Sequence, residues 1–547
     1  MPLLPLGFNG VDHPVPVSPI DGPFSLPVKL QQGVNVIVRD AVDEMGFADH
    51  GVRTYAYSTQ WYPIDAANPD ASRVPDGMGL NLGAAVWDDG DRADTDSIAD
   101  VLVLYLKTID LGSMIGSDPI TGPSQYGCGY SITINSVTFD RNNVGLSIVP
   151  VNGGLRLEAT LNNVVAAFHA DMQNKPFCIL SDFDGTITVP WVKAVTTVLI
   201  SVDPGTGEPL VTNGGTTVTM ADPVLSTDNW LVNLLKTFFI SSLKDALIDA
   251  FEGAIGDVIG DTLAGALTQL NLHQILTVGP LLEGGAAVDV TLDAKLGSVV
   301  FDPAGGLLGM KTTATAPRGT PHSPLGSIGR ASCLSGVAEP FALPRAYPLE
   351  VALHDDVLNQ VVYGIYWGGG LAFPVGADMV GDLSQYGVTD VNLFVDFLLP
   401  PILTACNPEA QLKAQLGDIS IAGSLKLFGS TVNVQMYATA LADASVGASD
   451  GELSVAIGQL TFADIEIESL TGGLAGGEDL LSGLVRNTLL PQLLGGFAGQ
   501  TLGSFPLPSI PLDSLGEGIP PGTSISIDLQ QVVRVYGYTV AQGTVKQ

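Results

Sequence analysis

The sequence of 547 residues predicts an α+β protein. Two observations carry this prediction. Long stretches with period-two alternation, which is typical of half-buried strands, follow one another without helices between them. Each series of strands is then followed by one amphipathic helical stretch, and this order occurs twice along the chain. Consecutive strands followed by a helix indicate an α+β fold, whereas α/β folds alternate the two elements.

Residues 1–95 precede the first series and are rich in Pro, Asp and Gly. We expect them to form an N-terminal extension with a few strands and long loops. An acidic run at the end of this extension precedes a predicted helix, and a helix N-terminus favours negative charge. The apolar residues of this helix recur at the spacing of one helical face: Ile98, Val101, Leu102, Tyr105 and Leu106.

The first series of strands begins at residue 130. Alternating apolar residues, separated by Asn, Gly and Pro, predict strands over 130–139, 146–151, 154–172, 185–203 and 215–220. A long amphipathic helix follows, whose apolar stripe comprises Leu231, Leu234, Leu235, Phe238, Phe239, Leu243, Leu247 and Phe251. We assign 96–275 to this first unit.

The same order recurs in the second half of the chain. A central part, 276–345, holds strands at 287–294 and 296–301 and a border dense in Pro and Gly. The second unit, 346–547, has predicted strands over 361–367, 369–373, 391–405, 416–423, 424–447, 451–470 and 519–545, the first two as a hairpin across a glycine turn. A second amphipathic helix carries Leu481, Leu484, Val485 and Leu489 on its apolar face.

The charge balance excludes two classes of function. The chain has 56 Asp and Glu against 22 Lys and Arg, a net charge of −34, and no basic run. Nucleic-acid binding and electrostatic docking on anionic membranes are therefore not expected, because both depend on clustered cations.

Apolar residues make up 46% of the chain, which predicts a large core or an interior that also holds an apolar ligand. No stretch is clean enough for a transmembrane helix.

The chain is predicted not to be an enzyme. Asp182 and Asp184 stand in the sequence DFDGT, which is typical of aspartyl phosphatases, but that chemistry needs a helix soon afterwards and here the sequence continues as a strand. Ser449 stands in a Gly-x-Ser-x-Gly match, and another strand follows where a lipase has a helix. The six histidines show no local metal-binding spacing.

An acidic loop ahead of the first helix is the candidate metal site. Asp89, Asp91, Asp94 and Asp96 are spaced somewhat like oxygen ligands of Ca²⁺, but the loop lacks the glutamate and glycine positions of a calcium-binding EF-hand loop. A solvated loop that caps the helix is the favoured interpretation. Calcium is the alternative, and no other cofactor apart from a bound lipid is expected.

The four cysteines, Cys128, Cys178, Cys333 and Cys406, are even in number and form no Cys-x-x-Cys pair, so zinc spacing is absent. Two disulfides in an oxidising compartment are the favoured interpretation, and four buried thiols are the alternative. The expected pairs are Cys128 with Cys178 and Cys333 with Cys406, because each pair lies inside or beside one repeat. We therefore expect the protein outside the cytoplasm: secreted, periplasmic or at the cell surface.

Over residues 98–547 the sequence resembles the bactericidal/permeability-increasing protein family, the two-barrel members of the tubular lipid-binding (TULIP) superfamily. The phrases that carry the resemblance are SVTFDRNNVGLSIVPVNGGLRLEATL, DPGTGEPLVT, VALHDDVLNQVVYGIYWGGGLAF and VRNTLLPQLLGGFAGQTLGSFPLPSI. Two features depart from that family. Cys128 and Cys178 do not fall at its characteristic disulfide, and the first unit is acidic where its lipopolysaccharide-binding members are basic.

The resemblance implies two elongated barrels, each a curled antiparallel sheet wrapped on a long amphipathic helix, joined end to end. The apolar stripes of the two helices would then line tunnels, although ordinary core packing explains the stripes equally well. The implied function is extracytoplasmic binding, and possible transfer, of amphipathic lipids. A membrane surface or a basic protein is the expected partner. The alternative is a structural or adhesive surface protein that uses the barrels as a rigid rod.

Overall fold

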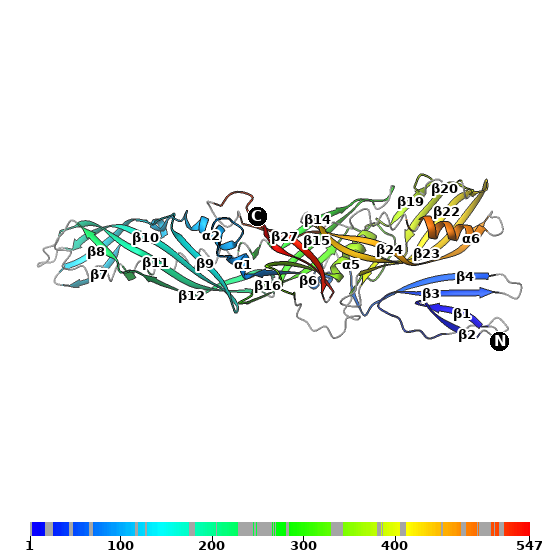
Figure 1. Cartoon of the computed structure of the whole chain (residues 1–547), viewed down its shortest axis with the longest axis horizontal. Helices are drawn as coiled ribbons and strands as arrows, with labels where there is room; N and C mark the ends of the chain where they lie inside the picture. Colours follow the sequence, from blue (N-terminus) through cyan, green and yellow to red (C-terminus); the bar gives the residue numbers. More distant parts are fainter. Residues whose placement is uncertain are drawn as a thin grey trace.

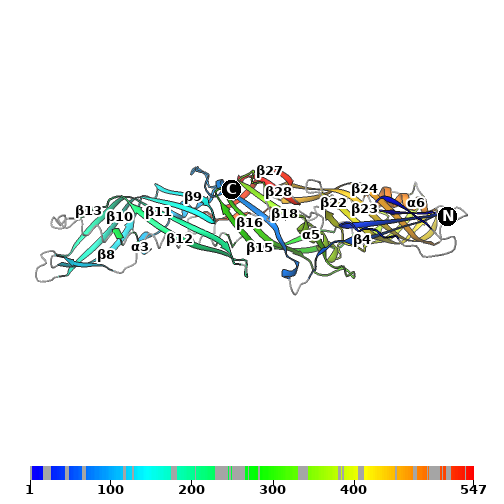
Figure 2. The same cartoon turned by 90° about the horizontal axis from the view of Figure 1, so that it is seen from below.

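The computed structural model of the chain is an elongated molecule built mainly from antiparallel strands (Figures 1 and 2). A curled sheet lies at each end, a central sheet joins the two, and an N-terminal sheet lies beside the second curled sheet. The structure describes residues 3–16, 26–42, 48–64, 69–114, 119–125, 128–173, 181–203, 205–227, 244–245, 248, 265, 267–268, 270–280, 284–329, 343–379, 384, 387–404, 412–449, 452–471, 477–489, 491, 505–507, 509–512, 519–535 and 537–546.

The first curled sheet contains the first predicted series of strands. Its order is β12–β11–β10–β8–β7, with β9 paired to β10 and β13 paired to β11. The alternation rule is confirmed here, because each stretch predicted as a strand lies in one. The strands are β7 (Ile120–Gln125), β8 (Cys128–Thr138), β9 (Val144–Val151), β10 (Gly154–Gln173), β11 (Phe183–Val202), β12 (Pro209–Met220) and β13 (Val224–Thr227).

A local break lets the two longest strands of this sheet keep their apolar side chains on one face. The β10–β11 pairing is interrupted at Asn163 and Pro190 and resumes in the same register. The buried hydrophobic residues of β10 are odd-numbered up to Leu161 and even-numbered from Val164. Asn163 has a φ of 52°, which Asn tolerates better than most residues, and Pro190 has no amide hydrogen to donate. The apolar face therefore stays continuous across the break.

Three short helices precede this sheet: α1 (Ala84–Trp87), α2 (Ile98–Leu106) and α3 (Leu111–Met114). The helix predicted from the i, i+3, i+4 spacing is α2, so that prediction is confirmed. Ser97 caps it, because its hydroxyl accepts from the Asp100 amide and the Asp100 carboxylate accepts from the Ser97 amide. This reciprocal pair satisfies two donors at the start of the helix.

The central sheet is assembled from distant parts of the chain. Its order is β14–β15–β16–β6–β18–β28–β27–β26, so a strand from the N-terminal region lies in its interior. The segments predicted at 287–294 and 296–301 form one continuous strand, β15. The strands are β6 (Val74–Gly83), β14 (Leu272–Val278), β15 (Val288–Asp302), β16 (Gly305–Thr315), β18 (Leu349–His354), β26 (Ile510–Pro511), β27 (Ser524–Val535) and β28 (Tyr538–Lys546).

The second curled sheet has the order β19–β20–β22–β23–β24–β25, with β21 paired to β22. The helix α6 (Gly477–Leu484) follows its strands and continues as a helical turn over Val485–Leu489, which confirms a helix at this place as far as residue 489. The strands are β19 (Ala372–Gly376), β20 (Val388–Phe397), β21 (Ile402–Thr404), β22 (Leu412–Leu427), β23 (Ser430–Ser449), β24 (Glu452–Thr471) and β25 (Phe505–Pro506).

The hairpin predicted over 361–367 and 369–373 is wrong. The first of these stretches belongs to the helix α5 (Asp355–Trp367), and β19 pairs with β20. Its β-branched and aromatic residues favour a strand locally, but propensity yields to tertiary packing where a segment is buried. The His354 side chain caps the helix by accepting from the Asp356 amide at 3.0 Å. Every residue from Asp355 to Tyr366 is buried, so α5 is enclosed on all sides and not on one face alone.

Residues 1–95 contribute to three sheets. The N-terminal sheet, β2–β1–β3–β4, is formed by β1 (Leu3–Phe8), β2 (Val11–Pro16), β3 (Gly33–Val42) and β4 (Ala48–Tyr57). The strand β5 (Gln60–Tyr62) pairs with β17 (Ser327–Gly329), a short 3₁₀ turn (Pro69–Ser72) follows, and β6 enters the central sheet.

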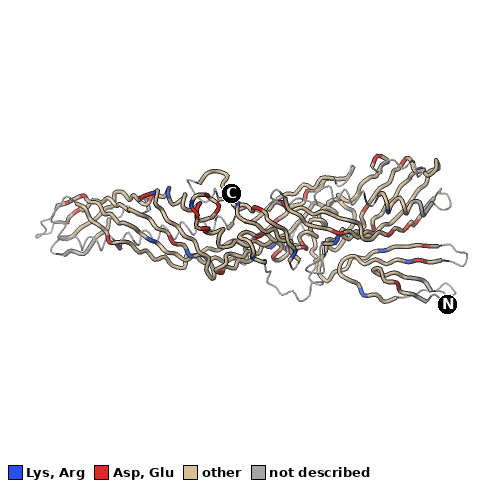
Figure 3. Tube along the Cα trace, viewed as in Figure 1, with Lys and Arg blue, Asp and Glu red and all other residues tan. Residues whose placement is uncertain are grey.

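The described residues are mostly in strands, so the β part of the predicted α+β fold is present, while the long helix over 231–259 falls outside the described residues except at three positions. Lys244, Asp245 and Ile248 are helical, and Ile248 packs against the core. None of the described helices is long and apolar enough to cross a membrane. Acidic residues occur on both curled sheets and on the N-terminal sheet, and they are densest between α1 and α2 (Figure 3).

Candidate functional site

The buried face of the first curled sheet is apolar along the whole of β10. None of the described β10 side chains on this face is polar. Phe168 meets Phe183 of β11 edge to face, with ring centroids 6.0 Å apart. Three alanines lie among larger apolar side chains on this face, whose members are Leu155, Leu157, Ala159, Leu161, Val164, Ala166, Phe168, Ala170 and Met172. The described part of this interior therefore offers neither a charge nor a hydrogen-bonding group along β10.

The second curled sheet has a matching apolar face. The buried side chains of β22 are all apolar among its described residues, and β23 adds four alanines at alternate positions: Ala438, Ala440, Ala442 and Ala444. Of the predicted lining of the second helix, Leu481 and Val485 are fully buried against this core and Leu484 is half-buried. Leu489 ends the helical turn, and its side chain lies outside the described set.

The other predicted lining and disulfide residues fall mostly outside the described residues. This applies to the whole first stripe: Leu231, Leu234, Leu235, Phe238, Phe239, Leu243, Leu247 and Phe251. It applies also to Cys178, Cys333 and Cys406, while the backbone of Cys128 begins β8. Both disulfide pairs and the first tunnel therefore stay predictions.

The two sequence matches to catalytic motifs lie at strand ends. Asp182 precedes β11 and its carboxylate accepts from the Met172 amide at 2.7 Å, while Asp184, on β11, pairs with the His169 ring at 2.8 Å. Asp182 and Asp184 thus join neighbouring strands of one antiparallel sheet. Ser449 is the last residue of β23, and β24 begins at Glu452. Among the described residues a strand, and not a helix, follows each motif, as the sequence predicts.

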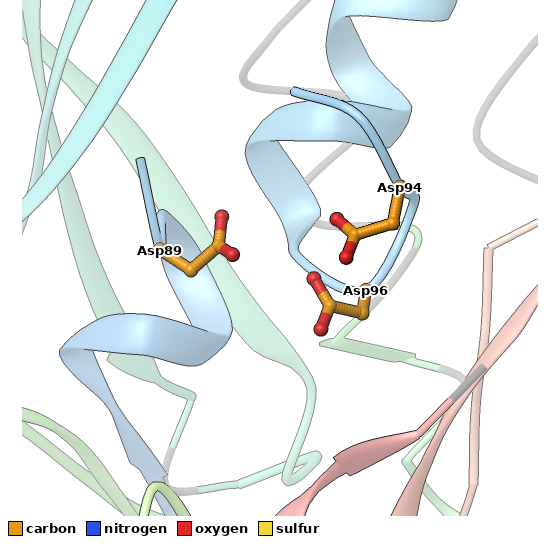
Figure 4. A group of neighbouring side chains, drawn as sticks. All are labelled: Asp89, Asp94 and Asp96. Atoms are coloured by element: carbon orange, nitrogen blue, oxygen red, sulfur yellow. The ribbon is translucent and has the colours of Figure 1, made fainter. Parts of the chain in front are cut away.

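The acidic loop between α1 and α2 brings three of its four candidate ligands together (Figure 4). Asp89, Asp94 and Asp96 each place a carboxylate oxygen within 4.8 Å of the others. Asp91 is not in this group, and its carboxylate accepts from the Ala93 amide. Three carboxylates would supply part of the six to eight oxygen ligands that Ca²⁺ takes.

Arg92 balances part of the charge of this loop. Its guanidinium contacts Asp88 at 2.7 Å and Asp100 at 2.9 Å, but lies 3.9 Å from Asp89. The cluster of Asp89, Asp94 and Asp96 therefore keeps a surplus of negative charge. Burial, together with repulsion from Asp94 and Asp89, raises the pKa of Asp96 to about 6, and its Oδ1 is buried without a hydrogen-bond partner among the described residues.

We expect Asp96→Asn to stabilise the protein at neutral pH and to have little effect near pH 4. The folded state raises the pKa of Asp96 from 3.8 to about 6, so the folded state binds the proton more tightly than the unfolded state does. Stability is therefore lost as pH rises from about 4 to about 6, and asparagine avoids this loss. Thermal unfolding of both proteins at pH 4 and pH 7.5 measures the effect.

The same pair of proteins tests the calcium hypothesis. A bound Ca²⁺ would neutralise the cluster, so it would raise the melting temperature of the original protein at pH 7.5 and leave that of Asp96→Asn unchanged. Equal responses of the two proteins to Ca²⁺ would contradict a site at Asp96 and leave the solvated capping loop. A lower melting temperature of Asp96→Asn at pH 7.5 would contradict the pKa argument itself.

These features define an elongated protein of curled antiparallel sheets with apolar buried faces. The sequence matches no protein-family model and no curated protein. Among solved structures, it is similar to a lipopolysaccharide binding protein, with 15% identity, a TM-score of 0.41, and coverage of 86% of this chain and 99% of that one. It is also similar to P47 of Clostridium botulinum E1 (9% identity, TM-score 0.28, 86% and 100% coverage) and to P47 from Clostridium botulinum A2 (10%, 0.24, 86% and 97%). Similarity at this level assigns no function, so the proposals rest on this chain's own residues.

Proposed function

We propose that this protein binds amphipathic lipids outside the cytoplasm, with acyl chains along the buried faces of the two curled sheets. The observation that carries the proposal is the absence of polar side chains from the buried faces of β10 and β22 among the described residues. Each methylene group buried there contributes about 0.8 kcal/mol, so acyl chains need no charged contact for affinity. The polar headgroup would stay at a barrel opening, because burying it without partners is costly.

Transfer of the lipid between membranes is the finer part of this proposal. A net charge of −34 repels anionic headgroups, which favours a neutral membrane or a basic protein as the partner. An extracytoplasmic location is supported by the even number of cysteines. The chemistry proposed here needs no catalytic residue, in keeping with the expectation that the chain is not an enzyme.

The elongated shape favours a second candidate, a structural or adhesive rod (Figure 2). A rod needs only a solid apolar core, whereas a lipid carrier needs an interior that its ligand completes. Native mass spectrometry of the protein after mild purification separates the two. Lipid adducts that disappear on extraction, with a fall in melting temperature, support lipid binding. A protein without adducts, whose melting temperature does not change on extraction, supports the rod.

A matched pair of variants tests whether the lipid lies on the buried face of β10. Ala166 is buried and Ala167 is half-exposed, so phenylalanine at these neighbouring positions adds the same volume to opposite faces of β10. We expect Ala166→Phe to carry less lipid than the original protein and Ala167→Phe to carry the same amount. Lipid content of the folded fraction is measured by native mass spectrometry. Equal lipid content in the two variants would contradict a lipid on this face. If the interior is a solid core without lipid, Ala166→Phe would instead lower the free energy of unfolding by about 1–3 kcal/mol through overpacking.

A further inference from the structure

The N-terminal sheet is attached to the second curled sheet through side chains. The outer edge of β4 runs along β22, β23 and β24. The Val52 amide donates to Glu466 at 2.8 Å, and the Thr54 amide donates to Asp418 at 3.1 Å. An open strand edge can pair with another backbone, but these two amides donate to carboxylates. The attachment can therefore open without breaking a strand pair within either sheet.

His50 bridges the two sheets. Its Nδ1 lies 2.6 Å from Asp40, which stands directly opposite on β3, and its Nε2 lies 2.9 Å from Asp464 on β24. Both ring nitrogens face carboxylate oxygens, and only the protonated imidazolium can donate to both. The hydrogen bond to Asp464, followed by that to Asp40, raises the pKa of His50 to about 9 against the cost of burial.

The other charged groups around His50 are arginines and carboxylates. Arg486, on the helical turn after α6, lies 3.7 Å from Asp464, and Arg39 pairs with Asp49 on the neighbouring strands at 2.8 Å. Arg53 pairs with Glu466, which is buried. The reference pKa values of arginine, aspartate and glutamate side chains lie well outside pH 6.5–9. Among these contacts His50 is therefore the group that titrates between pH 6.5 and 9.

The attachment covers a small apolar cluster. Three valines of the N-terminal sheet pack against side chains of β17 and β21, with Phe462 of β24 at the margin. The buried members are Val34, Val36, Val52, Ile328 and Ile402. Opening would expose this cluster, the buried carboxylates Asp464 and Glu466 and the edge of β4 together.

We propose that the N-terminal sheet is a pH-dependent cover on the outer wall of the second curled sheet, held closed by protonated His50 and loosened when the ring loses its proton. Loss of the proton leaves one ring nitrogen with a lone pair that faces a carboxylate, and Asp464 is only 8% exposed. The direction of the pH dependence follows from the raised pKa of His50. The contribution of protonated His50 to the stability of the attachment is fully present below pH 6.5 and is lost as pH rises through about 9.

Hydrogen exchange of the full chain tests the proposal, with rates divided by the intrinsic exchange rate at each pH. Protection of the β4 amides should fall about tenfold or more between pH 6.5 and pH 9.5. His50→Ala should show the low protection already at pH 6.5. His50→Arg, which stays charged, should keep the high protection at pH 9.5. Peptides from β10 report whether the rest of the molecule stays folded.

His169→Ala is the matched control, because His169 also pairs with an aspartate directly opposite it, but within the first curled sheet. This variant should leave the protection of β4 unchanged. Protection of β4 that is equal at the two pH values, or equal in His50→Ala and the original protein, would overturn the proposal. Loss of protection in β4 and β10 together would also overturn it, since that result describes global unfolding and not the opening of a cover.

Discussion

Arg534→Ala should lower the free energy of unfolding by about 3–5 kcal/mol, because it removes one partner of a buried ion pair. The Arg534 guanidinium on β27 donates to both carboxylate oxygens of Asp355 at 2.6 and 2.8 Å. Asp355, the first residue of α5, is completely buried. The pair thus ties the C-terminal part of the central sheet to α5. Urea unfolding, followed by a signal from the central sheet, measures the loss.

Arg39→Ala is the control for this prediction. Arg39 and Asp49 form a single contact of 2.8 Å, and both side chains are largely exposed. Solvent and salt weaken such pairs, so the variant should unfold close to the original protein. Similar losses in the two variants would contradict the argument from burial.

Glu350→Gln should lower the free energy of unfolding by about 2–4 kcal/mol, although it changes the shape of the side chain very little. Glu350 is fully buried on β18, and its two oxygens accept from the backbone amides of Arg345, Ala346 and Tyr347 and from the side chain of Gln542. Glutamine replaces one of these acceptor oxygens with a donor, so at least one buried donor loses its partner. Urea unfolding again provides the measurement.

Asp203→Asn is the matched control, because Asp203 also organises a turn by accepting from the amides of Gly205 and Thr206, but in an exposed position. Water can replace an exposed acceptor, so this variant should change the stability much less. If Glu350→Gln has no larger effect than Asp203→Asn, the amides at Glu350 do not depend on the carboxylate.

The sequence predicts strands well where one face is buried, and less well where tertiary contacts decide. The alternation of 154–172 and 185–203 identifies β10 and β11, but the break at Asn163 and Pro190 has no local pattern that an alternation rule detects. The sequence does not predict α5, because its valines and aromatic residues favour strands in isolation. Alternating Met78, Leu80 and Leu82, by contrast, were a usable signal for β6 that the Pro- and Gly-rich composition of the region obscured.

The candidate site, like the fold, can be predicted from the sequence only in part. Composition predicts an apolar interior, and the described faces of β10 and β22 agree with it. The spacing in the sequence predicts four aspartates of the acidic loop as candidate metal ligands. Three of them lie together in the structure, because the conformation of the loop determines which carboxylates meet. The bridge from His50 to Asp464 connects residues far apart in the sequence. A single sequence holds no signal for such a pair, because nothing local distinguishes these two residues from other surface histidines and aspartates.

The position of β6 in the central sheet has a consequence for biosynthesis. Leu80 of β6 pairs with Leu308 of β16 on one side and with Val351 of β18 on the other. When the ribosome releases β6, neither partner has been made, and the whole first curled sheet must be synthesised before β16 appears. Until then β6 has two open edges, which are sites of aggregation. Contacts so distant in sequence slow folding, so closure of the central sheet is expected to come late, after β28 has left the ribosome.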